Sequence, residues 1–180
     1  IREGLKNARQ VDGRFEKVPC SQGFDVFVDY AHTPDALSKI LEEIKKICRR
    51  QIIIVFGCGG NRDRSKRAMM GTIASELADL VIITSDNPRT EDSGKINKDI
   101  LAGVDEKNQS KFTVEDNRKK AIYLALDMAV PGDCILIAGK GHENYQIIGD
   151  KFHSFSDRET IINRLKNPIV SKHSTSLHHH

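Results

Sequence analysis

The sequence predicts an α/β fold, in which a mostly parallel sheet of about six strands has helices on both faces and is followed by a C-terminal β-hairpin. Two observations carry this prediction. Short apolar runs rich in β-branched residues recur along the chain, as is typical of buried strands. Between these runs lie segments whose apolar residues recur at helical spacing. Such alternation favours parallel strands joined by helices.

The first half of the chain supplies three strand–helix units. Strands are expected at residues 24–29, 51–56 and 80–84. Helices are expected from residue 34, over about 66–77 and over about 95–104. Thr33 is a candidate N-cap and Pro34 occupies the favoured first helical position. One apolar face of this first helix is formed by Leu37, Ile40, Leu41, Ile44 and Ile47.

The second half continues the pattern and ends differently. Strands are expected at 112–115 and 134–138, with a helix over 117–128. Residues 145–148 and 151–155 flank Gly149-Asp150 and predict a β-hairpin, after which Ser156 caps a helix reaching Leu165. Residues 14–18 are expected to pair with 24–28 as an antiparallel edge. The resulting arrangement is Rossmann-like.

Composition excludes several classes of protein. A chain of 180 residues predicts one domain with a real core, and 38% hydrophobic with 29% charged residues is typical of a soluble globular protein. The net charge of +3 is spread along the chain, which gives no argument for nucleic acid. No run approaches the roughly 18 apolar residues that span a membrane. Four widely spaced cysteines fit a reduced, cytoplasmic compartment and form no metal-binding pattern.

Both ends of the chain are expected to lie outside the folded domain. The start is polar and lacks methionine, which suggests a cut inside a longer protein. We therefore assign residues 1–10 to a linker from a preceding domain, 11–166 to the domain, and 167–180 to a disordered tail with an affinity-tag remnant. The three terminal histidines are left out of any metal argument.

Polar loops follow four of the predicted core strands. Because the carboxyl ends of parallel strands share one edge, these loops should converge where ligands bind in open α/β sheets. The loops are Asp29-Tyr30-Ala31-His32-Thr33-Pro34-Asp35, the glycine-rich segment 57–67, Asp86-Asn87-Pro88-Arg89, and Gly139-Lys140-Gly141-His142-Glu143.

The residue types in these loops indicate a site for a zwitterionic amino acid. Proline at 88 restricts its own φ and the conformation of Asn87, which directs Arg89. A guanidinium binds a carboxylate through two parallel hydrogen bonds. Arg62 and Arg89 opposite Glu143 therefore match a ligand with carboxylates and an ammonium group. Asp29 would accept hydrogen bonds from sugar hydroxyls, with His32 or Tyr30 packing on a base.

Plainer interpretations stay open for single residues. Arg89 can be a solvated arginine in an ordinary turn, and Asp29 with His32 can simply close a strand–helix turn. Cys58 with His142 is a conceivable nucleophile pair, although a small buried residue is the favoured role for Cys58. The histidines lack a metal-ligand spacing, and the glycine loops match neither common phosphate-binding fingerprint.

Taken together, the loops resemble the C-terminal domain of the MurE-type Mur ligases from about Val11 to Leu165. The motifs that carry the resemblance occur in the family's order: Asp29-Tyr30-Ala31-His32-Thr33-Pro34-Asp35-Ala36-Leu37, Phe56-Gly57-Cys58-Gly59-Gly60-Asn61-Arg62-Asp63, Asp86-Asn87-Pro88-Arg89-Thr90-Glu91, and Ala138-Gly139-Lys140-Gly141-His142-Glu143. The resemblance implies contacts to meso-2,6-diaminopimelate by Arg62, Asp86, Asn87, Pro88, Arg89, Gly139 and Glu143. It implies contacts on the ATP side by Arg14, Asp29 and His32.

The resemblance also implies a reaction in peptidoglycan synthesis. A carboxylate of UDP-N-acetylmuramoyl-L-Ala-D-Glu is phosphorylated by ATP with Mg²⁺, and the amino group of the incoming amino acid attacks the acyl phosphate. In that family the phosphate loop and metal ligands lie in other domains. We therefore expect no catalytic or metal-binding residue in this chain and no ligation by the chain alone. The alternatives are a ligase that adds L-lysine or a diaminopimelate analogue, and a non-catalytic nucleotide or amino-acid binding module.

Overall fold

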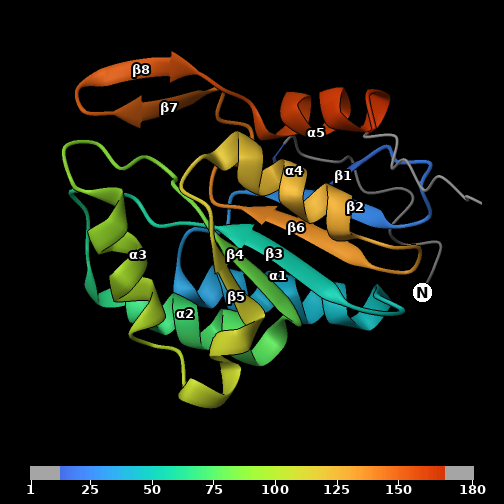
Figure 1. Cartoon of the computed structure of the whole chain (residues 1–180), viewed down its shortest axis with the longest axis horizontal. Helices are drawn as coiled ribbons and strands as arrows, with labels where there is room; N and C mark the ends of the chain where they lie inside the picture. Colours follow the sequence, from blue (N-terminus) through green and yellow to red (C-terminus); the bar gives the residue numbers. More distant parts are fainter. Residues whose placement is uncertain (1–12, 169–180) are drawn as a thin grey trace, which may run out of the picture.

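The computed structural model describes residues 13–168, so the predicted linker 1–10 and the chain from 169 onward lie outside the described residues. Figure 1 shows a central twisted sheet between two layers of helices, with a separate β-hairpin beside one end of the sheet. The predicted α/β class, the sheet of about six strands and the hairpin are all confirmed.

The central sheet has the strand order β1-β2-β6-β3-β4-β5. Its strands are β1 (Glu16–Val18), β2 (Asp25–Asp29), β6 (Cys134–Ala138), β3 (Ile52–Phe56), β4 (Leu80–Ile83) and β5 (Phe112–Val114). Strands β2 to β6 run parallel, whereas β1 pairs antiparallel with β2 through Glu16–Val28 and Val18–Val26. The predicted antiparallel edge is therefore confirmed.

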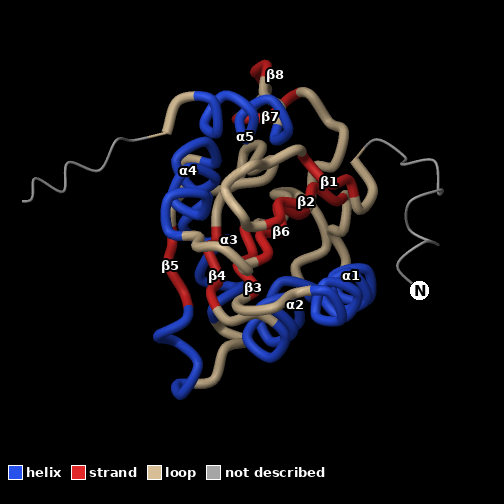
Figure 2. The backbone as a smooth tube through the Cα atoms, turned by 90° about the vertical axis from the view of Figure 1, so that its right-hand side faces the viewer, coloured by secondary structure: helices blue, strands red, loops and turns tan. Residues whose placement is uncertain are grey.

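Two apolar cores cover the two faces of this sheet. Helices α1 (Pro34–Ile47), α2 (Ser65–Leu77) and α3 (Ser93–Leu101) lie on one face, and α4 (Arg118–Met128) and α5 (Asp157–Lys166) on the other (Figure 2). Alternation along each strand divides the core, since Ile54 packs toward the first layer and Ile53 toward the second. This two-sided burial explains why the strands are uninterrupted apolar runs.

The helix starts follow the expected capping chemistry. Thr33 Oγ1 accepts a hydrogen bond from the backbone N of Ala36 (3.3 Å), and Ser156 Oγ accepts one from Glu159 (3.2 Å). These caps were predicted. Asp92 caps α3 in the same way, which places its start at Ser93, two residues earlier than expected.

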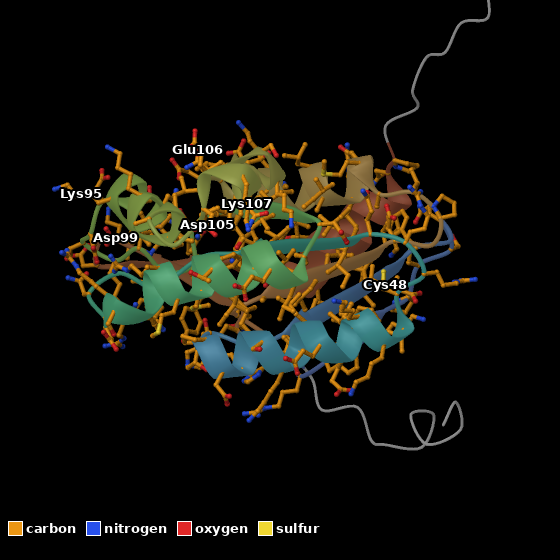
Figure 3. All side chains as sticks on the ribbon, turned by 90° about the horizontal axis from the view of Figure 1, so that it is seen from below. Cys48, Lys95, Asp99, Asp105, Glu106 and Lys107 are labelled. Atoms are coloured by element: carbon orange, nitrogen blue, oxygen red, sulfur yellow. The ribbon has the colours of Figure 1, made fainter. Side chains whose placement is uncertain are left out.

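Two details differ from the sequence-based expectation. Ile47, assigned to the apolar face of the first helix, is 42% exposed because it lies in the last turn, just before the chain leaves the helix at Cys48 (Figure 3). A 3₁₀ helix, η1 (Glu106–Lys111), was not predicted, since its six residues are polar and show no apolar spacing.

Strands β7 (Tyr145–Ile148) and β8 (Lys151–Ser154) form the predicted antiparallel hairpin. The hairpin joins the loop after β4, because the backbone N of Arg89 donates to Ile147 O (3.1 Å) and Gly149 N donates to Arg89 O (2.7 Å). It therefore stands at the carboxyl edge of the sheet. No helix in residues 13–168 combines the length and apolar character needed to cross a membrane.

A fully buried ion pair connects helices α4 and α5 to the carboxyl edge of the sheet. Arg118 Nε and Nη2 each lie 2.8 Å from an oxygen of Asp157, and neither side chain is exposed. Arg118 also donates to the carbonyl oxygens of Ser85 (3.3 Å) and Ala138 (3.0 Å). One guanidinium thus connects the first turns of both helices to the ends of β4 and β6.

Candidate ligand-binding site

The register of the parallel strands brings the polar loops to one edge. Asp29 pairs with Ala138 across β2 and β6, and Phe56 pairs with Ile83 across β3 and β4. The four loops begin at these strand ends. Their predicted convergence is therefore confirmed, and the contacts between them define the site.

Asn87 lies at the centre of these contacts and is 6% exposed. Its Oδ1 accepts hydrogen bonds from Lys140 Nζ (2.8 Å) and from the backbone N of Ile147 (2.9 Å). Its Nδ2 lies 3.4 Å from Glu143 Oε2, and its carbonyl oxygen accepts from the backbone N of Gly60 (2.9 Å). Through its side chain and its backbone carbonyl, Asn87 therefore joins three loops and the hairpin.

Arg89 is held in a left-handed backbone conformation, with φ of 54°. An arginine rarely adopts this conformation, and here the two backbone hydrogen bonds to the hairpin maintain it. Its Nη1 donates to the carbonyl oxygens of Gly60 (3.0 Å) and Asn87 (3.3 Å). Within residues 13–168 the guanidinium forms hydrogen bonds through Nη1 alone, so its other N–H groups remain open to a ligand.

The glycine-rich loop allows two arginines to approach each other. A Cβ added at Gly59 would lie 3.2 Å from Arg89 Nη1 and 3.6 Å from Arg62 Cγ, so both side chains flank this glycine. A Cβ at Gly60 would lie 1.9 Å from the carbonyl oxygen of Pro88. Any residue other than glycine would therefore clash with the backbone at this position. Arg62 itself is exposed. The predicted arginine pair is thus assembled, with one member buried more deeply than the other.

Glu91 anchors the glycine-rich loop through hydrogen bonds from Asn61 and Arg67. Its carboxylate oxygens lie 2.7 and 2.8 Å from the Nη atoms of the fully buried Arg67, and the backbone N of Asn61 donates to it at 3.0 Å. The hydrogen bonds from Arg67, followed by that from Asn61, lower the pKa of Glu91 from 4.5 to about 2. Arg67 also binds Gly59 O (3.2 Å) and Asp99 (3.0 Å), and Figure 3 labels Asp99 on α3.

A second pocket adjoins the arginine site. It has a volume of about 350 Å³ and is lined by Arg14, Phe15, Asp29, Tyr30, Ala31, His32 and Ala36. All three residues expected on the ATP side therefore come together. Tyr30 connects the two regions, because its ring contacts those of His32 and His142 (centroids 4.5 and 6.2 Å away). Burial, and then the charges of Glu143 and Asp86, raise the pKa of Tyr30.

Two residues of this pocket have structural contacts as well. Asp29 accepts hydrogen bonds from the backbone N of Phe15 and of Ala31, both at 2.7 Å. His32 Nδ1 lies 2.8 Å from Tyr30 O, and because a carbonyl only accepts, Nδ1 is the donor; in the neutral imidazole Nε2 is then an acceptor. The turn-closing interpretation of Asp29 is thus correct, and it leaves two of about four carboxylate lone-pair positions for a ligand.

Sequence reasoning missed one residue at the centre of the site. Lys140 is fully buried, and its Nζ contacts Asn87, Tyr145 O (3.0 Å), Asp86 (3.3 Å) and Glu143 (3.6 Å). From the sequence, Lys140 was named only within the loop 139–143 and its motif, and no role in the site was predicted for it. The available signal was a lysine between two glycines, Gly139 and Gly141, which have φ of 114° and 55°. Glycine adopts such positive φ values at little steric cost, so the two glycines allow the tight path of the loop around Lys140.

The structure argues against a Cys58–His142 nucleophile. Cys58 is 3% exposed, and its burial raises the pKa of the thiol to about 12. Its Sγ lies 3.7 Å from Met70 Sδ in the core. The role as a small buried residue is therefore confirmed.

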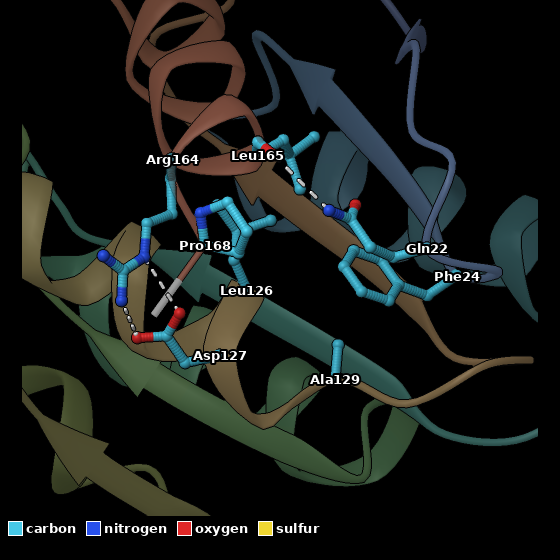
Figure 4. A pocket seen from close by; sticks show the side chains of 8 residues that line it. All are labelled: Gln22, Phe24, Leu126, Asp127, Ala129, Arg164, Leu165 and Pro168. Atoms are coloured by element: carbon cyan, nitrogen blue, oxygen red, sulfur yellow. Dashed lines mark hydrogen bonds and ion pairs between the residues drawn. The ribbon is translucent and has the colours of Figure 1, made fainter. Parts of the chain in front are cut away.

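Another pocket, of about 420 Å³, lies at the opposite end of the sheet (Figure 4). It is lined by Gln22, Phe24, Leu126, Asp127, Ala129, Arg164, Leu165 and Pro168. Phe24 precedes β2 and Ala129 precedes β6, so this pocket faces the amino ends of the strands. Its one ion pair joins Arg164 to Asp127 (2.6 Å). It contains none of the predicted site residues.

The chain matches known proteins over most of its length. Residues 13–141 match the family model described as "Mur ligase, glutamate ligase domain". The UDP-N-acetylmuramoyl-L-alanyl-D-glutamate–2,6-diaminopimelate ligase of Syntrophomonas wolfei is 46% identical over 94% of this chain, and that of Clostridioides difficile 52% identical over 88%. A solved structure of a ligase with this name has a TM-score of 0.81 and 39% identity over 91% of the chain.

The chain spans only 32–35% of the length of these relatives. The match nevertheless includes the strand ends and the loops that build the arginine site and the pocket beside it, up to Gly141. The fold, the order of the motifs and the extent of the family match agree. This chain belongs to the Mur ligase family and corresponds to the C-terminal domain of its diaminopimelate-adding members.

Proposed function

We propose that this chain is the amino-acid-binding domain of an ATP-dependent ligase that adds meso-2,6-diaminopimelate to UDP-N-acetylmuramoyl-L-Ala-D-Glu in peptidoglycan synthesis. The observation that carries the proposal is the arrangement of Arg62 and Arg89 around Gly59, with Asn87 between Arg89 and Glu143. Positive and negative groups fixed at one sheet edge suit a ligand that carries both charges. The similar ligases of Syntrophomonas wolfei and Clostridioides difficile are named for this amino acid.

Each group of the ligand has a counterpart in the proposed site. Arg62 and Arg89 bind the two carboxylates, and Asn87 Nδ2 supplies a further donor. Glu143 and the carbonyl oxygen of Gly139 receive the ammonium group at the distal end. Asp86 and Pro88 shape the loop that carries these groups, since Asp86 is 7% exposed and faces Gly139. The remaining amino group is left free to react.

The second carboxylate is the basis for selecting diaminopimelate over L-lysine. Lysine would leave one partly buried guanidinium without its partner, which costs about 2–5 kcal/mol, or roughly 30- to 5000-fold in selection. A ligase adding lysine is therefore the disfavoured alternative. A diaminopimelate analogue with two carboxylates would satisfy the same contacts.

The ATP side of the proposal concerns the pocket of Arg14, Asp29 and His32. The free lone pairs of Asp29 can accept ribose hydroxyls, His32 Nε2 can accept from a base, and Arg14 is exposed beside them. Among residues 13–168, no three His, Cys, Asp or Glu side chains are grouped to hold a metal ion. We assign Mg²⁺, the phosphates and the UDP-linked dipeptide to other parts of the ligase, and the reaction to the cytoplasm.

Titration of the isotope-labelled chain with meso-diaminopimelate tests the assignment, because NMR detects even millimolar binding. We expect shifts in the resonances of Arg62, Asn87, Arg89 and Glu143, and weaker or no shifts with L-lysine. Equal responses to both ligands would refute selection by Arg89. Shifts confined to other residues would refute the site.

The alternative of a non-catalytic binding module is tested separately. We expect the isolated chain to show no ATP turnover with diaminopimelate and the UDP-linked dipeptide, and the longer ligase that contains it to show turnover. Turnover by the isolated chain would contradict our assignment of catalysis to other domains. Inactivity of the longer protein would favour the module.

A further inference from the structure

Lys140 is a fully buried cation whose donors are all engaged within the protein. An ammonium group has three N–H donors. Nζ of Lys140 has its three shortest contacts with Asn87 Oδ1 (2.8 Å), Tyr145 O (3.0 Å) and Asp86 Oδ1 (3.3 Å), and Glu143 Oε2 follows at 3.6 Å. Lys140 therefore has no donor left for a ligand, and any role in binding must act through its neighbours.

The most direct effect is on the orientation of the Asn87 amide. Two donors, Lys140 Nζ and the backbone N of Ile147, both meet Oδ1. A rotated amide would place its NH₂ group against these two donors, which is strongly unfavourable in a buried site. The Nδ2 donor is therefore directed away from Lys140, toward Glu143.

The second effect is on charge. Asp86 and Glu143 place two carboxylates around Lys140, whose single positive charge leaves one negative charge in excess. Glu143 is the more open of the two, with 18% of its side chain exposed against 10% for Asp86. The unbalanced charge thus lies on the more exposed side of the cluster, and it matches a single ammonium group.

We propose that Lys140 is a positioning residue for amino-acid recognition: it directs the Asn87 amide and neutralises one carboxylate, so that the site accepts one ammonium group. This inference rests on the proposed function for the identity of the ligand. Its structural part, the control of Asn87 by Lys140, is independent of any ligand.

The ligand-free test is the side-chain amide resonance of Asn87 in Lys140→Met. We expect a clear change in its chemical shifts and a faster exchange of its protons with water, because one of the two donors at Oδ1 is lost. The matched control is Lys111→Met, which removes another lysine that binds carbonyl oxygens, those of Ser75 (2.8 Å) and Ala78 (3.5 Å), far from Asn87 in the sequence. An unchanged Asn87 amide in Lys140→Met would overturn the proposal.

A second variant separates charge from orientation and replaces the first if that does not fold. Lys140→Gln keeps an N–H donor but carries no charge. We expect the Asn87 amide to remain close to its native shifts, while the affinity for diaminopimelate changes because both carboxylates are left without their cation. Native affinity in this variant would show that the charge has no role.

A double-mutant cycle with meso-diaminopimelate tests the link to binding. We expect Lys140→Met to weaken binding about tenfold, the value of one lost hydrogen bond. In an Asn87→Ala background the same change should cost less, because the part of its effect that acts through the Asn87 amide is gone. Independent, additive losses would overturn the positioning role. If the unmodified chain does not bind diaminopimelate, the proposed function fails, and the ligand-free test still decides the role of Lys140.

Discussion

Two buried cations at the same sheet edge serve different purposes. Arg118 is enclosed by a carboxylate and two carbonyl oxygens, and its partner Asp157 is also fully buried, so the pair is closed and electrically balanced. Lys140 is equally buried, but it faces two carboxylates, one of which is partly exposed. Burial alone therefore does not distinguish structural charges from charges that serve recognition. The distinction is whether the cluster is balanced and closed or unbalanced and open.

The largest effect should come from breaking the closed pair. Arg118→Met leaves Asp157 buried without its cation, and we expect the free energy of unfolding to fall by about 3–5 kcal/mol. Denaturant unfolding of the chain measures this loss. A decrease in the free energy of unfolding below about 1 kcal/mol would show that the Arg118–Asp157 pair contributes little to stability.

The next effect concerns selection rather than stability. Arg89→Ala in the intact ligase should reduce the preference for diaminopimelate over lysine by up to the roughly 30- to 5000-fold expected for an unpaired, partly buried charge. The change should appear in kcat/KM, while ATP binding by the variant stays close to native. A variant with unchanged kcat/KM for diaminopimelate would remove Arg89 from the proposed site.

A smaller effect follows from Glu91. Because Arg67 lowers the pKa of Glu91 from 4.5 to about 2, this carboxylate stabilises the fold fully above pH 4.5, and its contribution declines as the pH falls from 4.5 toward 2. We expect Glu91→Gln to be less stable by about 2 kcal/mol at pH 7 and to lose less stability on acidification. Parallel stability curves for the variant and the native chain between pH 5 and 2 would contradict this assignment.

The smallest effect should come from the pocket at the amino ends of the strands. Arg164 pairs with Asp127 on a partly exposed surface and lies over the ring of Tyr123 (4.8 Å to the centroid). We expect Arg164→Met to cost less than about 1 kcal/mol and to leave diaminopimelate binding unchanged, which makes it the matched control for Arg118→Met. Altered ligand binding would show that this end of the sheet affects the site.

Much of the fold was predictable because its signals are local. Thr33 and Ser156 act on backbone groups three residues away, so a short window of sequence contains both partners. Strand β6 was predicted with its bounds correct, since a buried strand is an apolar run. The polar η1 helix has no such local signal and was missed.

The candidate site was predictable in its members but not in its organisation. Placing loops after parallel strands was enough to bring Arg62, Arg89 and Glu143 to one edge. The sequence did not show that Asn87 connects these loops, since its partners Lys140 and Ile147 lie 53 and 60 residues further along the chain. Contacts over such separations depend on how the strands are ordered and how the loops pack.

Sequence alone therefore sufficed for the fold class, for nearly every helix and strand, and for the edge that carries the site, because apolar periodicity, caps and glycine turns act within a few residues. Only the tertiary structure placed β6 between β2 and β3, paired Arg118 with Asp157 and buried Lys140 between Asp86 and Glu143. The physical reason is that the residues next to a charged side chain in the sequence do not show whether that side chain faces solvent or a buried partner. Burial and charge balance arise only once distant segments have packed together.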